Sequence, residues 1–139
     1  MAIHQLPEGI AIAFRCTQPE GVPRIRERTP RDADMPGDRV NVFIDFNGDG
    51  ETAYNFTIAL SHSVQDATIT NENAFSTDWD GDWKHRVTET ADGWSAEFLL
   101  PWTVASMKGS DAPRRTVAIM FDRVLGHTRE RSGFPAASF

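Results

Sequence analysis

The sequence predicts an all-β fold, an antiparallel β-sandwich of the jelly-roll kind, from three observations. Apolar and polar residues alternate with a period of two along most of the chain, as in half-buried strands. Helical periodicity is nearly absent. Clusters of Gly, Pro, Asn and Asp separate the alternating runs at the short spacing typical of sandwiches and barrels. A chain of 139 residues with 40% hydrophobic side chains fits a single domain, residues 1–139, with its own core.

Six alternating runs are expected to form the strands. They span residues 10–16, 39–45, 54–60, 83–87, 94–100 and 117–122. In the run 39–45, Val40, Val42 and Ile44 share one face, whereas Asn41 and Asp45 point to the other. Residues 23–34 carry four Arg and three acidic residues without periodicity, and we expect a long loop there.

Composition excludes several classes of function. The net charge of −6 and the scattered Lys and Arg residues argue against a nucleic-acid partner, which requires clustered basic residues. The single cysteine, Cys16, allows no internal disulfide, and no Cys/His spacing fits a zinc site. The longest apolar stretch, residues 117–121, is far shorter than a membrane-spanning helix. The N-terminal residues do not have the pattern of a secretion signal.

The segment 45–50, DFNGDG, places oxygen-bearing side chains at alternate positions before a glycine. Such a loop can wrap carboxylates around calcium, and Asp45, Asn47 and Asp49 are the expected ligands. The twelfth position of an EF-hand loop would be a bidentate Glu, and here it is Phe56. The alternative interpretation is a hairpin turn, because Asn-Gly and Asp-Gly between alternating strands are strong hairpin signals.

The segment 78–83, DWDGDW, combines three carboxylates with two indoles. Trp79 and Trp83 could stack on the apolar face of a sugar ring while Asp80 and Asp82 accept hydrogen bonds from its hydroxyls. Trp83 is equally consistent with a core position, since it is in phase with the strand that follows it. Trp79 lies outside any alternation, which favours a binding role.

Glu97 and Arg123 are charged residues within apolar strands, where each needs a partner. They could pair with each other, or Arg123 could donate to a ligand through its planar guanidinium. No motif typical of a nucleophilic serine, a metalloprotease helix or a phosphate loop is present. The sequence therefore predicts a protein that is not an enzyme.

Five segments follow one another in an order that resembles a known family. They are GDRVNVFID at 37–45, AYNF at 53–56, WDGDW at 79–83, DGWSAEFLLPW at 92–102 and FDR at 121–123. The series resembles the family 9 carbohydrate-binding modules and the DOMON-like domains related to them. The similarity runs from about residue 9 to about residue 125.

The resemblance implies a non-catalytic β-sandwich that binds a glycan of the glucan or xylan type, with Trp79, Trp83, Asp80, Asp82 and Arg123 as contact residues. It also implies structural calcium, and a domain cut from a longer periplasmic, cell-surface or extracellular protein. Family members open with a further segment containing DG, E and W, which has no counterpart in this chain, so an opening strand is expected to be absent.

Two other functions are compatible with the sequence. The first is an accessory domain that docks on the remainder of a longer surface protein and binds no sugar. Such a domain is expected to have one exposed apolar face, formed by Phe43, Leu99 and Met120. The second is a fragment of a glycoside-active enzyme, which needs two carboxylates facing each other in a cleft.

Overall fold

The computed structural model of the chain describes residues 1–71 and 73–135 and confirms the β-sandwich. The described residues form these strands: β1 (Ala2–Gln5), β2 (Gly9–Thr17), β3 (Arg39–Asp45), β4 (Thr52–Ala59), β5 (Val64–Thr70), β6 (Ala74–Ser76), β7 (Lys84–Thr90), β8 (Gly93–Pro101), β9 (Ala118–Val124) and β10 (Arg131–Phe134). All six predicted runs coincide with strands, and residues 23–34 lie in the connection between β2 and β3, as the expected loop.

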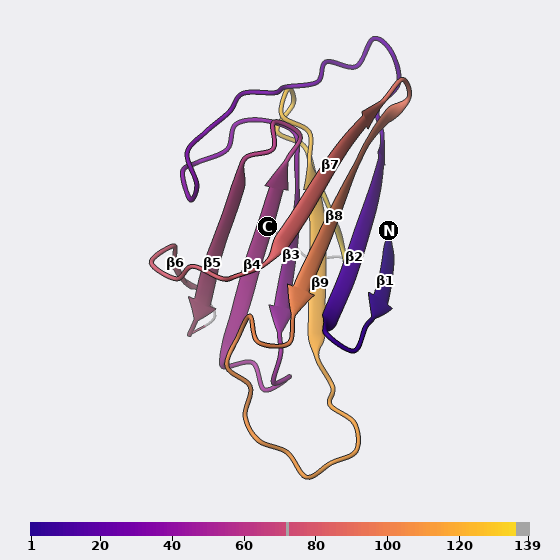
Figure 1. Cartoon of the computed structure of the whole chain (residues 1–139). Helices are drawn as coiled ribbons and strands as arrows, with labels where there is room; N and C mark the ends of the chain where they lie inside the picture. Colours follow the sequence, from indigo (N-terminus) through magenta and orange to yellow (C-terminus); the bar gives the residue numbers. More distant parts are fainter. Residues whose placement is uncertain (72, 136–139) are drawn as a thin grey trace.

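The strands form two antiparallel sheets that pack face to face (Figure 1). The four-stranded sheet has the order β1-β2-β8-β7, and the six-stranded sheet has the order β10-β9-β3-β4-β5-β6. β1, β5, β6 and β10 were not predicted, because they are short or lack a clear apolar face. The part of the chain described here contains no helix that could cross a bilayer.

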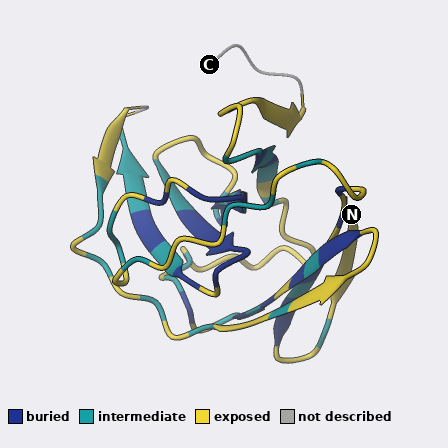
Figure 2. Ribbon diagram, turned by 90° about the horizontal axis from the view of Figure 1, so that it is seen from above, coloured by how far each residue is buried: buried dark blue, intermediate teal, exposed yellow. Residues whose placement is uncertain are grey.

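The core lies between the sheets, where the alternation predicts it. Ile12 and Trp94 of the four-stranded sheet are each 1% exposed, and Val42 and Phe56 of the six-stranded sheet are fully buried. Figure 2 shows the buried segments facing the space between the sheets, while exposed residues lie on the outlying strands and loops.

The outer face of the six-stranded sheet also buries polar side chains, which the alternation did not predict. Asn41 donates a hydrogen bond to Asp122 and accepts one of 2.6 Å from the Thr57 hydroxyl. Arg131 Nε lies 2.9 Å from Asp122 Oδ2. Burial raises the pKa of Asp122. These groups are neighbours across β4, β3, β9 and β10, so they pair with one another on this face.

A sandwich has two long sides where the space between its sheets opens to solvent. On one side, which we call the Asp66 side, Trp83 before β7 contacts Phe56 of β4 and Asp66 of β5. On the other, which we call the Ile3 side, Ile3 of β1 and Ile119 of β9 line one cavity. The two sides differ in the side chains that cover them.

Candidate functional site

The predicted sugar-binding segment is held in place by one buried carboxylate. Asp66 on β5 is fully buried, and its Oδ2 accepts hydrogen bonds from the Gly81 N–H at 2.7 Å and from Trp83 Nε1 at 3.0 Å. Arg31 Nη2 donates to both of its oxygens, at 2.7 and 2.8 Å. Charge-assisted hydrogen bonds of this kind are the strong ones. Asp66 thus fastens residues 77–83 and the long loop to β5.

The same arginine lies among three carboxylates. Asp32, Asp66 and Asp80 offer oxygens within 4.8 Å of one another. Arg31 Nε lies 3.6 Å from Asp32 Oδ2 and 3.0 Å from Asp80 Oδ1. Burial raises the pKa of Asp32, and the hydrogen bond that Asp32 accepts from the Asp66 N–H opposes this rise. The guanidinium supplies the positive charge that this cluster needs, so the cluster is explained by ion pairing within the chain.

Trp83 is largely engaged within the protein. Its ring stacks on Phe98 with a centroid distance of 5.8 Å and an interplanar angle of 13°, and it meets Phe56 edge to face at 5.4 Å. Its only polar atom donates to Asp66. Of the two interpretations of this residue, the geometry favours the structural one.

Trp79 differs from Trp83 in its contacts. It meets Tyr54 at a centroid distance of 4.8 Å and Phe56 at 5.9 Å, in both cases edge to face. The side chain is partly exposed, and Asp80 and Asp82 on either side of Gly81 are exposed. Within the described residues, Asp82 makes no side-chain hydrogen bond or ion pair. Trp79 therefore packs against the core with part of its side chain exposed, and the unpaired carboxylate of Asp82 is near it in sequence.

Arg123 belongs to a different part of the sandwich. It donates to the Thr17 carbonyl and to Gln18 Oε1, each at 3.0 Å, and so joins β9 to the end of β2. Glu97 lies 4.0 Å from Arg86 on the outer face of the four-stranded sheet. Glu97 and Arg123 do not pair with each other, which was one of the two possibilities, and among the described residues Arg123 makes no contact with Trp79 or Trp83.

The predicted calcium ligands lie together in the turn between β3 and β4. Asp45 Oδ1 accepts from the N–H groups of Asn47 and Gly48, and Oδ2 accepts from that of Gly50. Lys108 Nζ lies 2.7 Å from Asp49 Oδ2, and this ion pair lowers the pKa of Asp49.

The remaining predicted ligand atom is also occupied. Asn47 Oδ1 accepts hydrogen bonds from the Lys108 N–H at 2.9 Å and from Arg115 Nη1 at 3.0 Å. In this arrangement the three side chains accept hydrogen bonds and an ion pair from groups of the chain itself, and they do not fit a cation site. The contacts are those of the hairpin turn that was the alternative interpretation, and calcium binding stays a prediction.

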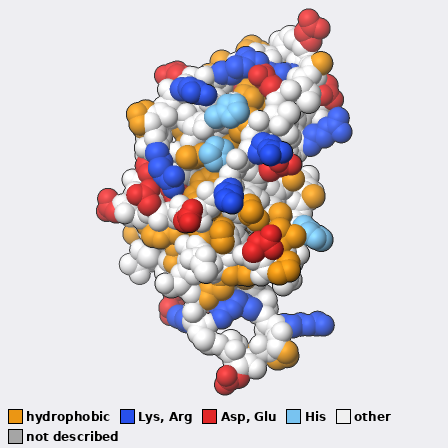
Figure 3. All heavy atoms as spheres, viewed as in Figure 1, with side chains coloured by type: hydrophobic (Ala, Val, Ile, Leu, Met, Phe, Trp, Pro, Cys, Tyr) orange, Lys and Arg blue, Asp and Glu red, His pale blue; other side chains and the backbone are white. Residues whose placement is uncertain are grey.

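The outer face of the four-stranded sheet carries a shallow groove of about 550 Å³. Ala11, Ala13 and Leu99 form part of its lining, and His4, Lys84, Arg86 and Glu97 supply charged or polar groups. Figure 3 views this face and shows hydrophobic side chains with charges of both signs around them. Groups of opposite sign lie together here, so the groove has no clear preference for a charged ligand.

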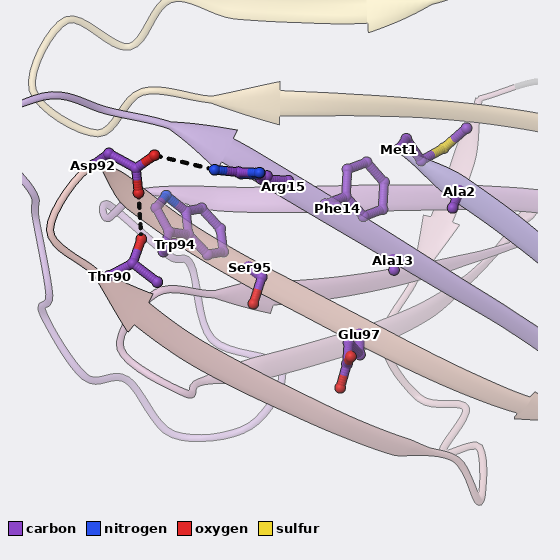
Figure 4. Close-up of a pocket in the computed structure, with 10 residues that line it drawn as sticks. All are labelled: Met1, Ala2, Ala13, Phe14, Arg15, Thr90, Asp92, Trp94, Ser95 and Glu97. Atoms are coloured by element: carbon purple, nitrogen blue, oxygen red, sulfur yellow. Dashed lines mark hydrogen bonds and ion pairs between the residues drawn. The ribbon is translucent and has the colours of Figure 1, made fainter.

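At one end of this face a second hollow is shaped by an ion pair. Asp92 accepts from Arg15 at 3.1 Å and from Thr90 at 2.8 Å (Figure 4). Both partners are exposed, and exposed pairs contribute little stability. The hollow lies beside the β7–β8 turn, and its ion pair is formed within the chain.

The prediction of one apolar face is wrong. Phe43 and Met120 are Cα partners on β3 and β9 of the six-stranded sheet. Leu99 lies on β8 of the four-stranded sheet. Each of the three points away from the core of its own sheet, so they lie on opposite outer faces of the sandwich.

No family model, curated protein or solved structure matches this chain. The resemblance to family 9 modules and DOMON-like domains therefore stays an expectation from the sequence.

Asp66 and Arg31, which organise the site, were not predicted from the sequence. The phase of Asp66 gave no signal, because residues 64–70 have no clear apolar face. Arg31 lies in a loop with an unusual density of arginines, which was a usable signal for ion pairs with carboxylates of the strands.

Proposed function

We propose that this domain is a non-catalytic glycan-binding module whose contact surface is centred on Trp79. The observation that carries the proposal is the anchoring of residues 77–83. Their backbone and Trp83 are fastened to a fully buried Asp66, whereas Trp79 stays partly exposed and Asp82 has no partner among the described residues.

Anchoring matters because binding costs less when the contact residues are already ordered. An indole held at the surface can stack on a sugar ring without first fixing its loop. The carboxylates of Asp80 and Asp82 can accept hydrogen bonds from hydroxyl groups. The site thus combines an apolar surface with a small number of polar anchors.

The charge of this segment favours an uncharged ligand. Asp78, Asp80 and Asp82 are all exposed, and among the described residues only Asp80 has a cationic partner, Arg31. These carboxylates would repel uronic acids and sulfated sugars. Neutral glycans of the glucan or xylan type fit best, and such a module would work outside the cytoplasm, in the periplasm, at the cell surface or in the medium.

The test is calorimetric titration with soluble xylan and β-glucan oligosaccharides. One aromatic stack contributes about 0.5–1.5 kcal/mol, so we expect millimolar to micromolar affinity. Trp79→Ala should weaken binding about two- to tenfold. Trp79→Tyr keeps an aromatic ring and should retain most of the affinity.

The matched control is Phe134→Ala, which removes an aromatic side chain that is 65% exposed on β10, at the opposite edge of the six-stranded sheet from β6. It should leave the titration unchanged. Equal affinities for the Trp79→Ala chain and the unaltered chain, with both folded by circular dichroism, would remove Trp79 from the site.

A further inference from the structure

Apolar side chains that point into the sandwich are left exposed on the Ile3 side. Ile3 pairs with Ile12 across β1 and β2, yet Ile3 is 44% exposed and Ile12 only 1%. Phe134 pairs with Phe121 and stacks on it at 5.6 Å, yet it is 65% exposed. The sheets therefore do not close over their own interior along this side.

A cavity of about 590 Å³ lies there, within the range of about 300–1,000 Å³ that is common for small-molecule sites. Its apolar lining comes from β1, β2, β9 and the loop between β8 and β9. The lining residues of this kind are Ile3, Ile10, Trp102, Met107, Pro113, Val117 and Ile119. Ile10 is 4% exposed, so the cavity reaches the core.

The charged residues that line this cavity are basic. Its other lining residues are Gln5, Arg114 and Arg115, and no carboxylate lines it. Arg115 is committed to the β3–β4 turn, since it donates to Asn47 Oδ1 at 3.0 Å. Arg114 makes no hydrogen bond or ion pair within the described residues. Figure 3 shows both basic and acidic side chains on the loop that follows β8, so the basic lining is a property of the cavity and not of the whole loop.

An unpartnered arginine is notable in a chain whose net charge is −6, because acidic side chains outnumber basic ones. An apolar lining beside a free guanidinium is complementary to a ligand with an apolar body and an anionic head. The groove on the four-stranded sheet, where Glu97 lies near Arg86, offers no such selectivity.

We propose that the cavity on the Ile3 side binds an amphipathic carboxylate, whose aliphatic or aromatic body packs against Trp102, Met107 and Ile119 and whose carboxylate pairs with Arg114. Trp102 Nε1, the only polar atom of the indole, donates to the Leu6 carbonyl at 3.3 Å. The ring can therefore provide an apolar surface to the ligand. This site is separate from Trp79, and the proposal does not rest on glycan binding.

The test is calorimetric titration of the whole chain with decanoate below its critical micelle concentration. Acetate supplies the charge without the apolar body, and decyltrimethylammonium supplies the body with the opposite charge. We expect decanoate to bind at least about tenfold more tightly than either. Equal binding of decanoate and decyltrimethylammonium, or no binding of decanoate, would overturn the proposal.

Two variants locate the site. Arg114→Glu should weaken decanoate binding about tenfold or more, because it replaces the partner of the carboxylate with a like charge. Arg86→Glu is the matched control: it makes the same charge change on the exposed outer face of the four-stranded sheet and should leave the affinity unchanged. Equal losses in both variants would show that only net charge matters and would refute the site.

A second copy of the chain is the competing occupant of this side. Sedimentation velocity should show a monomer with and without decanoate. A dimer that decanoate does not dissociate would mean that the exposed apolar side chains serve an interface, and the proposal would fail. The Trp79→Ala chain should keep decanoate binding, so this result and the glycan result can fail independently.

Discussion

The two long sides of the sandwich differ in the side chains that cover the space between the sheets. On the Asp66 side, charged loops cross from one sheet to the other: Arg31 pairs with Asp66, and Arg24 and Arg26 pair with Glu89 at the end of β7. On the Ile3 side, apolar side chains in the inward phase remain exposed beside a cavity. One side is sealed by the chain itself, and the other offers an unfilled apolar surface.

This difference predicts where mutations change the stability of the fold and where they change ligand binding. A buried carboxylate with several donors is costly to disturb, because removal of one partner leaves the others unsatisfied. A partly exposed apolar residue has little to lose on truncation, but it can gain by packing against a ligand. We therefore expect mutations on the Asp66 side to change folding, and mutations on the Ile3 side to change binding.

The largest effect is expected from Asp66→Ala, which tests whether polar contacts hold the Asp66 side closed. It leaves Arg31, the Gly81 N–H and Trp83 Nε1 without their acceptor. We expect a loss of about 3 kcal/mol in the free energy of unfolding, at the low end for a broken buried pair because Arg31 is 43% exposed. Urea denaturation followed by tryptophan fluorescence measures it.

Asp82→Asn is the matched control for that variant, since it removes a charge from the same segment at an exposed position. It should change the free energy of unfolding by less than about 0.5 kcal/mol. A small loss in the Asp66→Ala chain, similar to that of Asp82→Asn, would mean that the ion pairs do not hold this side closed.

The next test compares two residues that face each other in register. Ile12→Ala should cost about 2–4 kcal/mol, because it opens a cavity in the core. Ile3→Ala on the neighbouring strand should cost less than about 1 kcal/mol, because 44% of Ile3 is already in water. Equal losses in denaturation experiments would show that the Ile3 side is as tightly closed as the core.

A smaller effect is expected from pH on the Asp66 side. Partial burial lowers the pKa of His85 from 6.5, and His62 and Arg31 lower it further. The unfolded chain then binds the proton first as the pH falls below about 6.5, so stability is greatest above that pH and declines towards the pKa of the folded state. His85→Gln should reduce the decline measured between pH 7.5 and pH 5. An unchanged slope in the variant would assign the decline to other groups.

The strands and the core were predictable because each depends on a local pattern. Val40, Val42 and Ile44 alternate in the sequence and are fully buried in the structure. The side chains that position the candidate site were not predictable in the same way. Asp66 meets Arg31, Gly81 and Trp83 through pairings between segments far apart in the chain, and no local periodicity encodes such a meeting.

The exposure of single residues shows the same limit. Alternation assigns Asn41 to an outward face, but its cross-strand neighbours Thr57 and Asp122 cover it. Ile3 pairs with Ile12 and lies on the same face of the sheet, but β1 is an edge strand and Ile3 is 44% exposed. The face of a predicted strand on which a side chain lies follows from the sequence, whereas the burial of that side chain depends on the neighbouring strands.

The smallest expected effect concerns calcium at the β3–β4 turn. Both oxygens of Asp45 accept backbone N–H groups, and Lys108 pairs with Asp49 and Glu51. Calcium would have to displace these donors, so we expect millimolar calcium to leave the melting temperature unchanged within error. Binding of an ion to the folded state alone would raise the melting temperature. A rise that is lost in the Asp45→Asn chain and unaffected by Asp82→Asn would show that the turn opens to take the ion, and would confirm the calcium prediction.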